Sequence, residues 1–214
     1  MENYKYSIIL LLIGLSLNCI GQTKYSFDSV NIINVSEVDI DNWMCFLKSD
    51  SSKVTGVVYK LNSSGNLVIE NSYRDGLLNG VVRQWFDNGQ LEFQMSFKNG
   101  QQNGRTKIWH ENGQLSVEQN YKNGKSNGSF ARYFKNGQVQ AKGKRVKFQL
   151  DGILLNYYEN GHLKSEDNYV KNKLNGLSKS WYENGKIKSQ VLYQKDIIIS
   201  SKSWNEYGEV IDVK

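Results

Sequence analysis

The chain has 214 residues, with 27 Lys and Arg, 21 Asp and Glu, two His, two Cys and no Pro, and its formal net charge is +6. A charged fraction of 22% and an aromatic fraction of 12% are far from a disordered composition, and the length suits one or two domains. Two histidines and two cysteines leave almost nothing for a zinc site or a disulfide framework. The basic residues are spread along the sequence, so no nucleic-acid partner is expected. Composition therefore argues against a metalloenzyme, a disulfide-rich module and a coiled coil.

Residues 1–21 have the proportions of a secretory signal peptide. Lys5 precedes an apolar run, Ile8 to Leu17, that is shorter than the ~20 residues needed to span a hydrocarbon core. Cleavage before Gln22 would release a soluble chain, whereas Ser16-Leu17-Asn18-Cys19 loosely resembles a bacterial lipobox and makes Cys19 a candidate for lipidation. An N-terminal anchor or a buried apolar strand is the remaining alternative. The sequence thus predicts a bacterial protein exported to the periplasm, the outer membrane or the outside of the cell.

Residues 22–55 are rich in β-branched and apolar side chains and are predicted to form strands that cap the first edge of the structure that follows. Cys45 lies in the apolar string Trp43–Leu47 and is the single thiol that would remain after cleavage. We expect it to be a buried, unreactive cysteine.

Two series of glycines recur every 24 residues through the rest of the chain, which is the signature of a repeat protein. The first series is Gly65, Gly89, Gly113, Gly137, Gly161 and Gly185, and the second is Gly56, Gly80, Gly104, Gly128, Gly152 and Gly176. An apolar residue follows each glycine of the first series by two positions. Six tandem units therefore cover residues 56–200, and a degenerate repeat occupies 201–214.

Each unit is predicted to be one β-hairpin. In Val81–Gly104, a strand over Val81–Phe86 meets Asn88-Gly89, a pair typical of two-residue type I′ turns. The returning strand is expected to place Leu91, Phe93, Met95 and Phe97 on one face, and Lys98-Asn99-Gly100 and Asn103-Gly104 to reverse the chain toward the next unit. One hairpin is marginal alone, so the units must pair in sequence. The predicted fold is all-β, an elongated single-layer antiparallel meander of tandem hairpins.

The unit between Gly128 and Gly152 is irregular. Ala141, Gly143 and Arg145 stand where neighbouring units carry larger apolar residues, and Phe148 replaces a turn glycine. A local bulge, a weakened register or a bend is expected there.

Three segments share the order aromatic, aromatic, any residue, Asn, Gly, any residue, apolar, and so resemble the variant MORN repeat. They are Trp85–Leu91, Trp109–Leu115 and Trp181–Ile187. Together with the preceding Lys53-Val54-Thr55-Gly56, the arrangement is similar to the YwqK family of toxin–antitoxin antitoxins. The resemblance covers about residues 40–208 and implies a hairpin stack with a non-enzymatic binding role, with a toxin as one partner to consider.

We predict no catalytic, cofactor-binding or metal-binding residues. His110 and His162 occupy places that other units fill with aromatic or amide residues, so both are positional variants of the repeat. Glu111, Glu159 and Glu183 precede the Asn-Gly pairs and are expected to be solvated. No Gly-rich phosphate loop, nucleophile elbow or metal-ligand cluster is present in the sequence, so no cofactor and no enzymatic activity are expected.

An aromatic residue stands four positions before each glycine from Gly89 onward and forms the candidate partner-binding column. Its members are Trp85, Trp109, Tyr133, Tyr157 and Trp181. They are expected either to stabilise the sheet by cross-strand contacts or to form a platform for a peptide, a glycan or a partner protein. The adjoining aromatic residues, from Phe86 to Tyr182, must face the opposite side by strand alternation.

Three functions follow from these observations. The first is an exported, non-catalytic scaffold that binds a protein or peptide through an aromatic-rich sheet face or an open edge. The second is an immunity protein that neutralises a toxin. The third is a cell-envelope module in weak contact with anionic lipid or glycan.

Overall fold

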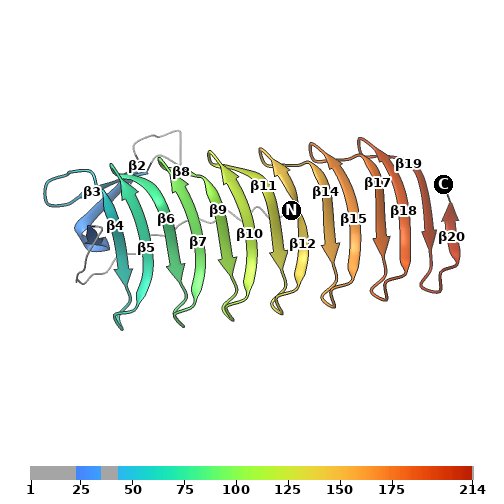
Figure 1. Ribbon diagram of the computed structural model, residues 1–214, viewed down its shortest axis with the longest axis horizontal. Helices are drawn as coiled ribbons and strands as arrows, with labels where there is room; N and C mark the ends of the chain where they lie inside the picture. Colours follow the sequence, from blue (N-terminus) through green and yellow to red (C-terminus); the bar gives the residue numbers. More distant parts are fainter. Residues whose placement is uncertain (1–22, 35–42, 214) are drawn as a thin grey trace.

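The computed structural model describes residues 23–34 and 43–213, and the predicted leader with Cys19 lies outside them, as does part of the predicted capping segment. Apart from a short 3₁₀ turn, the described elements are strands, and 18 of them form a single open sheet. Strands β4 to β20 follow one another in chain order as an antiparallel meander, with β4 and β20 at opposite ends of an elongated body (Figure 1). The predicted all-β, single-layer fold is confirmed.

The lines of strand in the meander alternate between an outgoing and a returning member of each hairpin, and in three outgoing lines a two-residue strand precedes the longer one. They are β4 (Gly56–Leu61), β5 (Leu67–Arg74), β6 (Leu77–Trp85), β7 (Leu91–Lys98), β8 (Gln101–Gln102), β9 (Gly104–Trp109), β10 (Leu115–Lys122), β11 (Lys125–Tyr133), β12 (Val139–Val146), β13 (Gln149–Leu150), β14 (Gly152–Tyr157), β15 (Leu163–Val170), β16 (Lys173–Leu174), β17 (Gly176–Trp181), β18 (Ile187–Gln194), β19 (Ile197–Trp204) and β20 (Val210–Val213).

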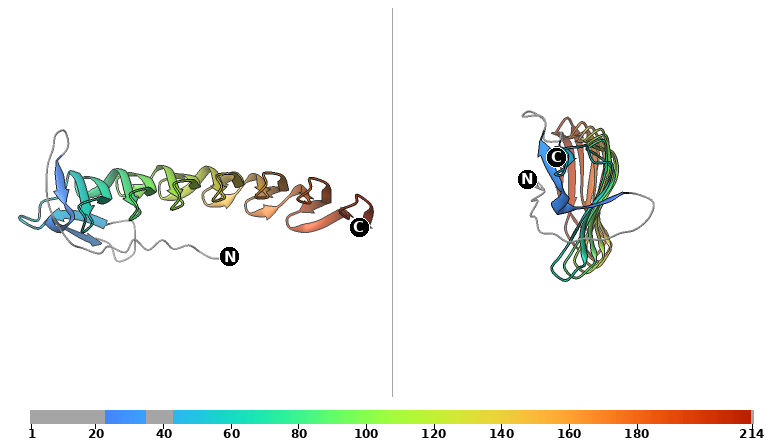
Figure 2. Two further views of the ribbon diagram at one scale, coloured as in Figure 1. Left: turned by 90° about the horizontal axis from the view of Figure 1, so that it is seen from below. Right: turned by 90° about the vertical axis from the view of Figure 1, so that its left-hand side faces the viewer.

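The N-terminal elements gather at the end of the sheet that begins with β4 (Figure 2). Strand β1 (Lys24–Ser26) pairs in parallel with β4 and is followed by the 3₁₀ turn η1 (Phe27–Ser29). Strands β2 (Val30–Asn34) and β3 (Trp43–Leu47) form a separate two-stranded sheet. Side chains from both sheets make the largest buried cluster among the described residues, which is Phe27, Val30, Cys45, Val54, Val58 and Tyr73.

Cys45 is fully buried in this cluster, as the sequence predicts. Its backbone N–H donates to the carbonyl oxygen of Gly76 at 2.7 Å, and its carbonyl oxygen accepts from Val54 at 3.0 Å. The two-stranded sheet is therefore tied to the first hairpins by backbone bonds as well as by apolar packing.

The type I′ turns lie at the other end of the hairpins from where the sequence places them. At Asn88-Gly89 only the glycine has a positive φ, of 81°, and Gly89 N–H donates to Phe86 O at 2.9 Å, which makes a three-residue loop with a glycine bulge. At Asn99-Gly100 both residues are left-handed, with φ of 50° and 79°, and Lys98 pairs with Gln101. Both ends carry Asn-Gly, so the dipeptide alone does not distinguish the two turns.

Contrary to the prediction, the chain does not reverse at Asn103-Gly104. Asn103 lies between β8 and β9 and Gly104 begins β9; both strands pair with β7, so the glycine is part of a bulge within one line of strand. Its φ is 112°, and a Cβ there would lie 3.0 Å from the Cβ of Ser96. Gly104 therefore marks a bulge with close approach to the paired strand rather than a turn, and a Cβ at Gly80, Gly128 or Gly176 would likewise lie within 3.3 Å of the strand paired with it.

The two faces of the sheet differ in what they carry. Residues paired directly across strands share a face. The capped face holds Val58 and Tyr73 of the N-terminal cluster, and along the sheet it holds the buried Val82, Thr106 and Phe130. The opposite side is called the open face. A register shift at Gln84/Trp85 sets Leu91 opposite Trp85 and Phe93 opposite Gln84, so Leu91 lies on the open face and not with Phe93, Met95 and Phe97 as predicted.

The irregular unit has the predicted local bulge, at Arg132/Tyr133, but its neighbours have the same bulge, and the predicted weakening of the register is wrong. Strands β11 and β12 pair from Gly128 to Tyr133 with the same shift before the aromatic residue that the other hairpins show. The small Gly143 is matched by the buried Phe130, whose ring would lie 3.1 Å from a Cβ at position 143. The side-chain volume that is missing at Gly143 on β12 is thus supplied by Phe130 on β11.

Candidate functional site

The predicted aromatic column lies in one row on the open face. Trp85, Trp109, Tyr133, Tyr157 and Trp181 are the last residues of β6, β9, β11, β14 and β17. Each pairs with the first residue of the returning strand, which is Leu91, Leu115, Val139, Leu163 or Ile187. All five aromatic side chains are half-buried. The column therefore contributes to packing and still presents aromatic surface.

The adjoining aromatic residues join one hairpin to the next. The hydroxyl groups of Tyr158 and Tyr182 donate to the backbone oxygens of Trp181 and Trp204 at 2.9 and 2.8 Å. Nε2 of His110 lies 3.3 Å from the backbone oxygen of Tyr133, and it makes the same bond when it carries the proton. His110 thus acts as a structural member of the repeat, and this agrees with its assignment as a positional variant.

Asparagines of the three-residue loops form a second ladder that sequence reasoning missed. Each uses Oδ1 to accept from the backbone N–H two residues on, for example Asn112 from Gln114 at 3.1 Å. Four of them also donate from Nδ2 to a carbonyl oxygen of the next loop at 2.8–3.3 Å, joining Asn88 to Glu111, Asn112 to Lys135, Asn136 to Glu159 and Asn160 to Glu183. The recurrence of Asn before Gly was the available signal.

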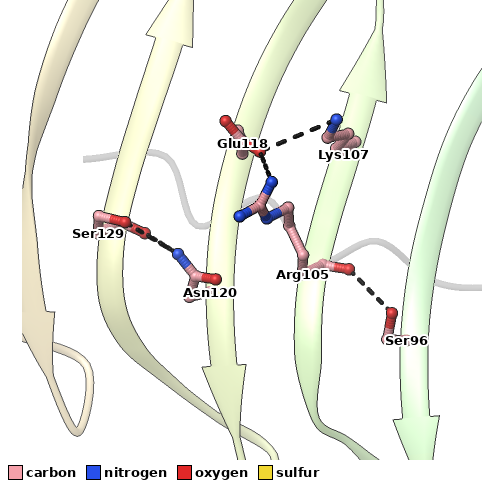
Figure 3. Close-up of polar contacts among 6 residues, drawn as sticks. All are labelled: Ser96, Arg105, Lys107, Glu118, Asn120 and Ser129. Carbon is pink, nitrogen blue, oxygen red and sulfur yellow. Dashed lines mark hydrogen bonds and ion pairs between the residues drawn. The ribbon is translucent and has the colours of Figure 1, made fainter.

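Ion pairs cross the open face in the N-terminal half of the array. Glu118 Oε1 accepts from Arg105 Nη1 at 3.1 Å and lies 4.0 Å from Lys107 Nζ (Figure 3). Glu70 on β5 pairs with Arg83 on β6, two repeat units before Glu118. In the C-terminal half the lysines lie over aromatic rings instead, with Lys142 5.4 Å from the Tyr157 ring centre and Lys202 5.1 Å from that of Trp204.

The two long rims of the sheet carry opposite charge. The type I′ turns, along the upper edge of Figure 1, form the basic rim, with Arg74, Lys98, Lys122, Lys125, Lys147, Lys171, Lys173 and Lys195 against Asp75 and Asp196. The three-residue loops, along the lower edge, form the acidic rim, with Asp87, Glu111, Glu159, Glu183, Glu206 and Glu209 against Lys135 and Lys186. Basic residues that are spread in sequence are therefore gathered in space.

Within residues 23–34 and 43–213, no three or more His, Cys, Asp or Glu side chains are grouped so that they could hold a metal ion. The same residues include no helix that is long and apolar enough to cross a membrane.

A single open sheet built from tandem β-hairpins with stacked loops defines the class, a β-hairpin repeat scaffold. Residues 78–99, 102–123, 150–171 and 174–195 match the family described as MORN repeat variant, which confirms the resemblance to that repeat over these four stretches. The matched stretches keep the period of the glycines, and the gap between the second and third holds the irregular unit. Such repeats form scaffolds that are typically non-catalytic and often bind membranes or proteins. No curated protein matches the chain.

Proposed function

We propose that the protein is an exported, non-catalytic scaffold that binds a protein or peptide on its open face. The observation that carries this proposal is the row of five half-buried aromatic side chains from Trp85 to Trp181. Trp and Tyr are favoured anchors of protein interfaces because they offer a large apolar surface and lose little entropy on binding. Those in this row repeat at the spacing of the hairpins, so an extended partner would meet several of them at once.

Affinity capture from intact cells, followed by mass spectrometry, tests the proposal and also gives the mature N-terminus. The variant Trp109→Ser/Tyr133→Ser/Tyr157→Ser is expected to lose the captured partner. Tyr207→Ser is the matched control, since Tyr207 is 85% exposed and lies outside the column. Circular dichroism of both variants checks that the sheet is retained. Equal capture by the triple variant and the control would refute the proposal.

A second candidate, contact with an anionic envelope surface, is favoured by the basic rim. In its last three turns, exposed apolar side chains stand among the lysines, with Phe148 51%, Val170 47% and Ile197 67% exposed. Mixed cationic and apolar residues are typical of surfaces that lie against anionic lipid. Sedimentation with phosphatidylglycerol vesicles is expected to weaken as salt rises, whereas phosphatidylcholine vesicles should not bind. Binding that is equal for both lipids would exclude this function.

The antitoxin role implied by the YwqK resemblance stays a prediction. A toxin gene beside the gene for this chain, and loss of toxicity on co-expression, would favour it.

A further inference from the structure

The open face is hollowed at the middle of the array, over the irregular unit. The hollow has a volume of about 400 Å³ and spans β10 to β14. Its open-face lining is Glu118, Ser129, Ala131, Lys142, Ile153 and Leu155. It lies alongside the aromatic column, because Tyr133 and Tyr157 end the two outgoing strands that line it.

Short side chains on β11 create the hollow. Ser129 and Ala131 stand at the places that Arg105 and Lys107 occupy one unit earlier. Those two cations reach across the face to Glu118, so the same place is filled there. At positions 129 and 131 of the irregular unit no side chain is long enough to reach across the face, and the surface is left low there.

One wall of the hollow, on β14, is apolar, and the adjoining strand β12 carries cationic side chains. Ile153 is 50% exposed and Leu155 is half-buried, both on β14. Lys142 is paired across the ladder with Ala131, and Lys144 with Ser129, and both lysines are exposed.

The charges around the hollow are unevenly neutralised. Glu118 on the far wall is already paired with two cations. Among the described residues, no ion pair reaches Lys142 or Lys144, and Lys142 lies only over the Tyr157 ring. The net charge of the chain is also positive. A ligand with carboxylates is therefore attracted electrostatically to the hollow, and a ligand with cationic groups is not.

We propose that this hollow is the anchor point for an extended peptide in which an apolar side chain is flanked by acidic residues. The apolar side chain enters the hollow above Ala131 and against Leu155, and a carboxylate two residues away meets Lys142 or Lys144. Alternate residues of an extended segment point to the same side, so both contacts can be made by one strand-like peptide. The inference rests on the proposed peptide-binding function of the open face and names the partner's chemistry.

Two exchanges that the repeat itself supplies test the site without endangering the fold. Ala131→Lys fills the hollow with a lysine, the residue at the equivalent position 107 of the preceding unit. Lys142→Gln removes a positive charge and introduces glutamine, the residue at the equivalent position 94. Lys164→Gln is the matched control, since Lys164 lies over the Tyr158 ring and outside the hollow.

The probes are N-acetylated seven-residue Gly/Ser peptides carrying a central Leu with Asp two residues to each side. Versions with Lys in place of Asp, or Ala in place of Leu, serve as comparisons. The ¹⁵N-labelled protein is titrated with each peptide and followed by NMR. The backbone amide chemical shifts of residues 129–131, 142–144 and 153–155 are expected to change. The acidic Leu peptide should bind at least tenfold tighter than either comparison. Ala131→Lys and Lys142→Gln should each weaken it at least fivefold, and Lys164→Gln should not.

Shifts that are absent from these segments, or that persist unchanged in Ala131→Lys, would overturn the inference. If capture of the cellular partner depends on the aromatic column and not on Ala131, the proposed function stands and this inference fails. If the peptides bind the hollow while capture is indifferent to the column, the proposed function fails instead.

Discussion

Gly104 and Gly152 offer a matched test of why the second glycine series exists. Their φ values are 112° and 111°, so an alanine at either place is strained by a similar amount, about 1–3 kcal/mol. Their surroundings differ. A Cβ at Gly104 would lie 3.0 Å from the Cβ of Ser96, whereas nothing lies within 4 Å of a Cβ at Gly152.

Gly104→Ala is therefore expected to lower the free energy of unfolding by more than Gly152→Ala does. Overpacking of one methyl group against a neighbouring strand adds about 1–3 kcal/mol to the backbone strain. Urea denaturation followed by circular dichroism measures both variants against the parent protein. The conformational term is common to both, so their difference reports the contact with Ser96.

Combining Ser96→Gly with Gly104→Ala separates the cost of the contact with Ser96 from the cost of backbone strain at position 104. The Oγ of Ser96 donates to the backbone oxygen of Arg105 at 3.3 Å, so Ser96→Gly alone has its own cost, which a double-mutant cycle subtracts. In the Gly104→Ala background it is expected to recover about 1–2 kcal/mol through loss of the clash. Equal destabilisation at Gly104 and Gly152, with no coupling to Ser96, would refute the account of close approach.

Three further outcomes are expected from single changes. Lys147→Asn should stabilise by about 0.5–1 kcal/mol, since residue 147 has φ of 49° and Asn tolerates this region better than Lys; thermal unfolding measures it. Tyr158→Phe should cost about 1 kcal/mol in the same assay through loss of the bond to Trp181 O, and an unchanged midpoint would contradict this. Burial raises the pKa of the Cys45 thiol to about 12, so only the unfolded chain loses this proton above about pH 9. This thiol therefore lowers stability by about 1.4 kcal/mol per unit between pH 9 and 12, and Cys45→Ala should flatten that slope.

Much of the fold was predictable because the repeat enforces it. The interval between glycines sets the length of a hairpin, and the absence of Pro permits an unbroken ladder of strands. The buried state of Cys45 followed from its apolar neighbours.

The errors share one cause, which is that bulges change the phase of a strand. The extra residue near Glu92 moves Leu91 to the other face from Phe93, and simple alternation does not see it. The bulge at Gly104 lets a glycine stand within a strand line where the sequence suggests a turn.

The candidate site was predictable only in part. The aromatic column from Trp85 to Trp181 is periodic, so the sequence placed it in a row. The hollow at Ala131 was not predicted, because it arises from a short residue on one strand beside Lys142 and Leu155 on the two strands that follow.

The sequence by itself determined that this chain is a ladder of hairpins with a regular row of aromatic residues, because period and turn chemistry are local properties. Only the tertiary structure decided which face each residue occupies, and that scattered lysines and glutamates line opposite rims. Those properties depend on the register between strands, which bulges reset, and the alternation of apolar and polar residues alone does not show that change.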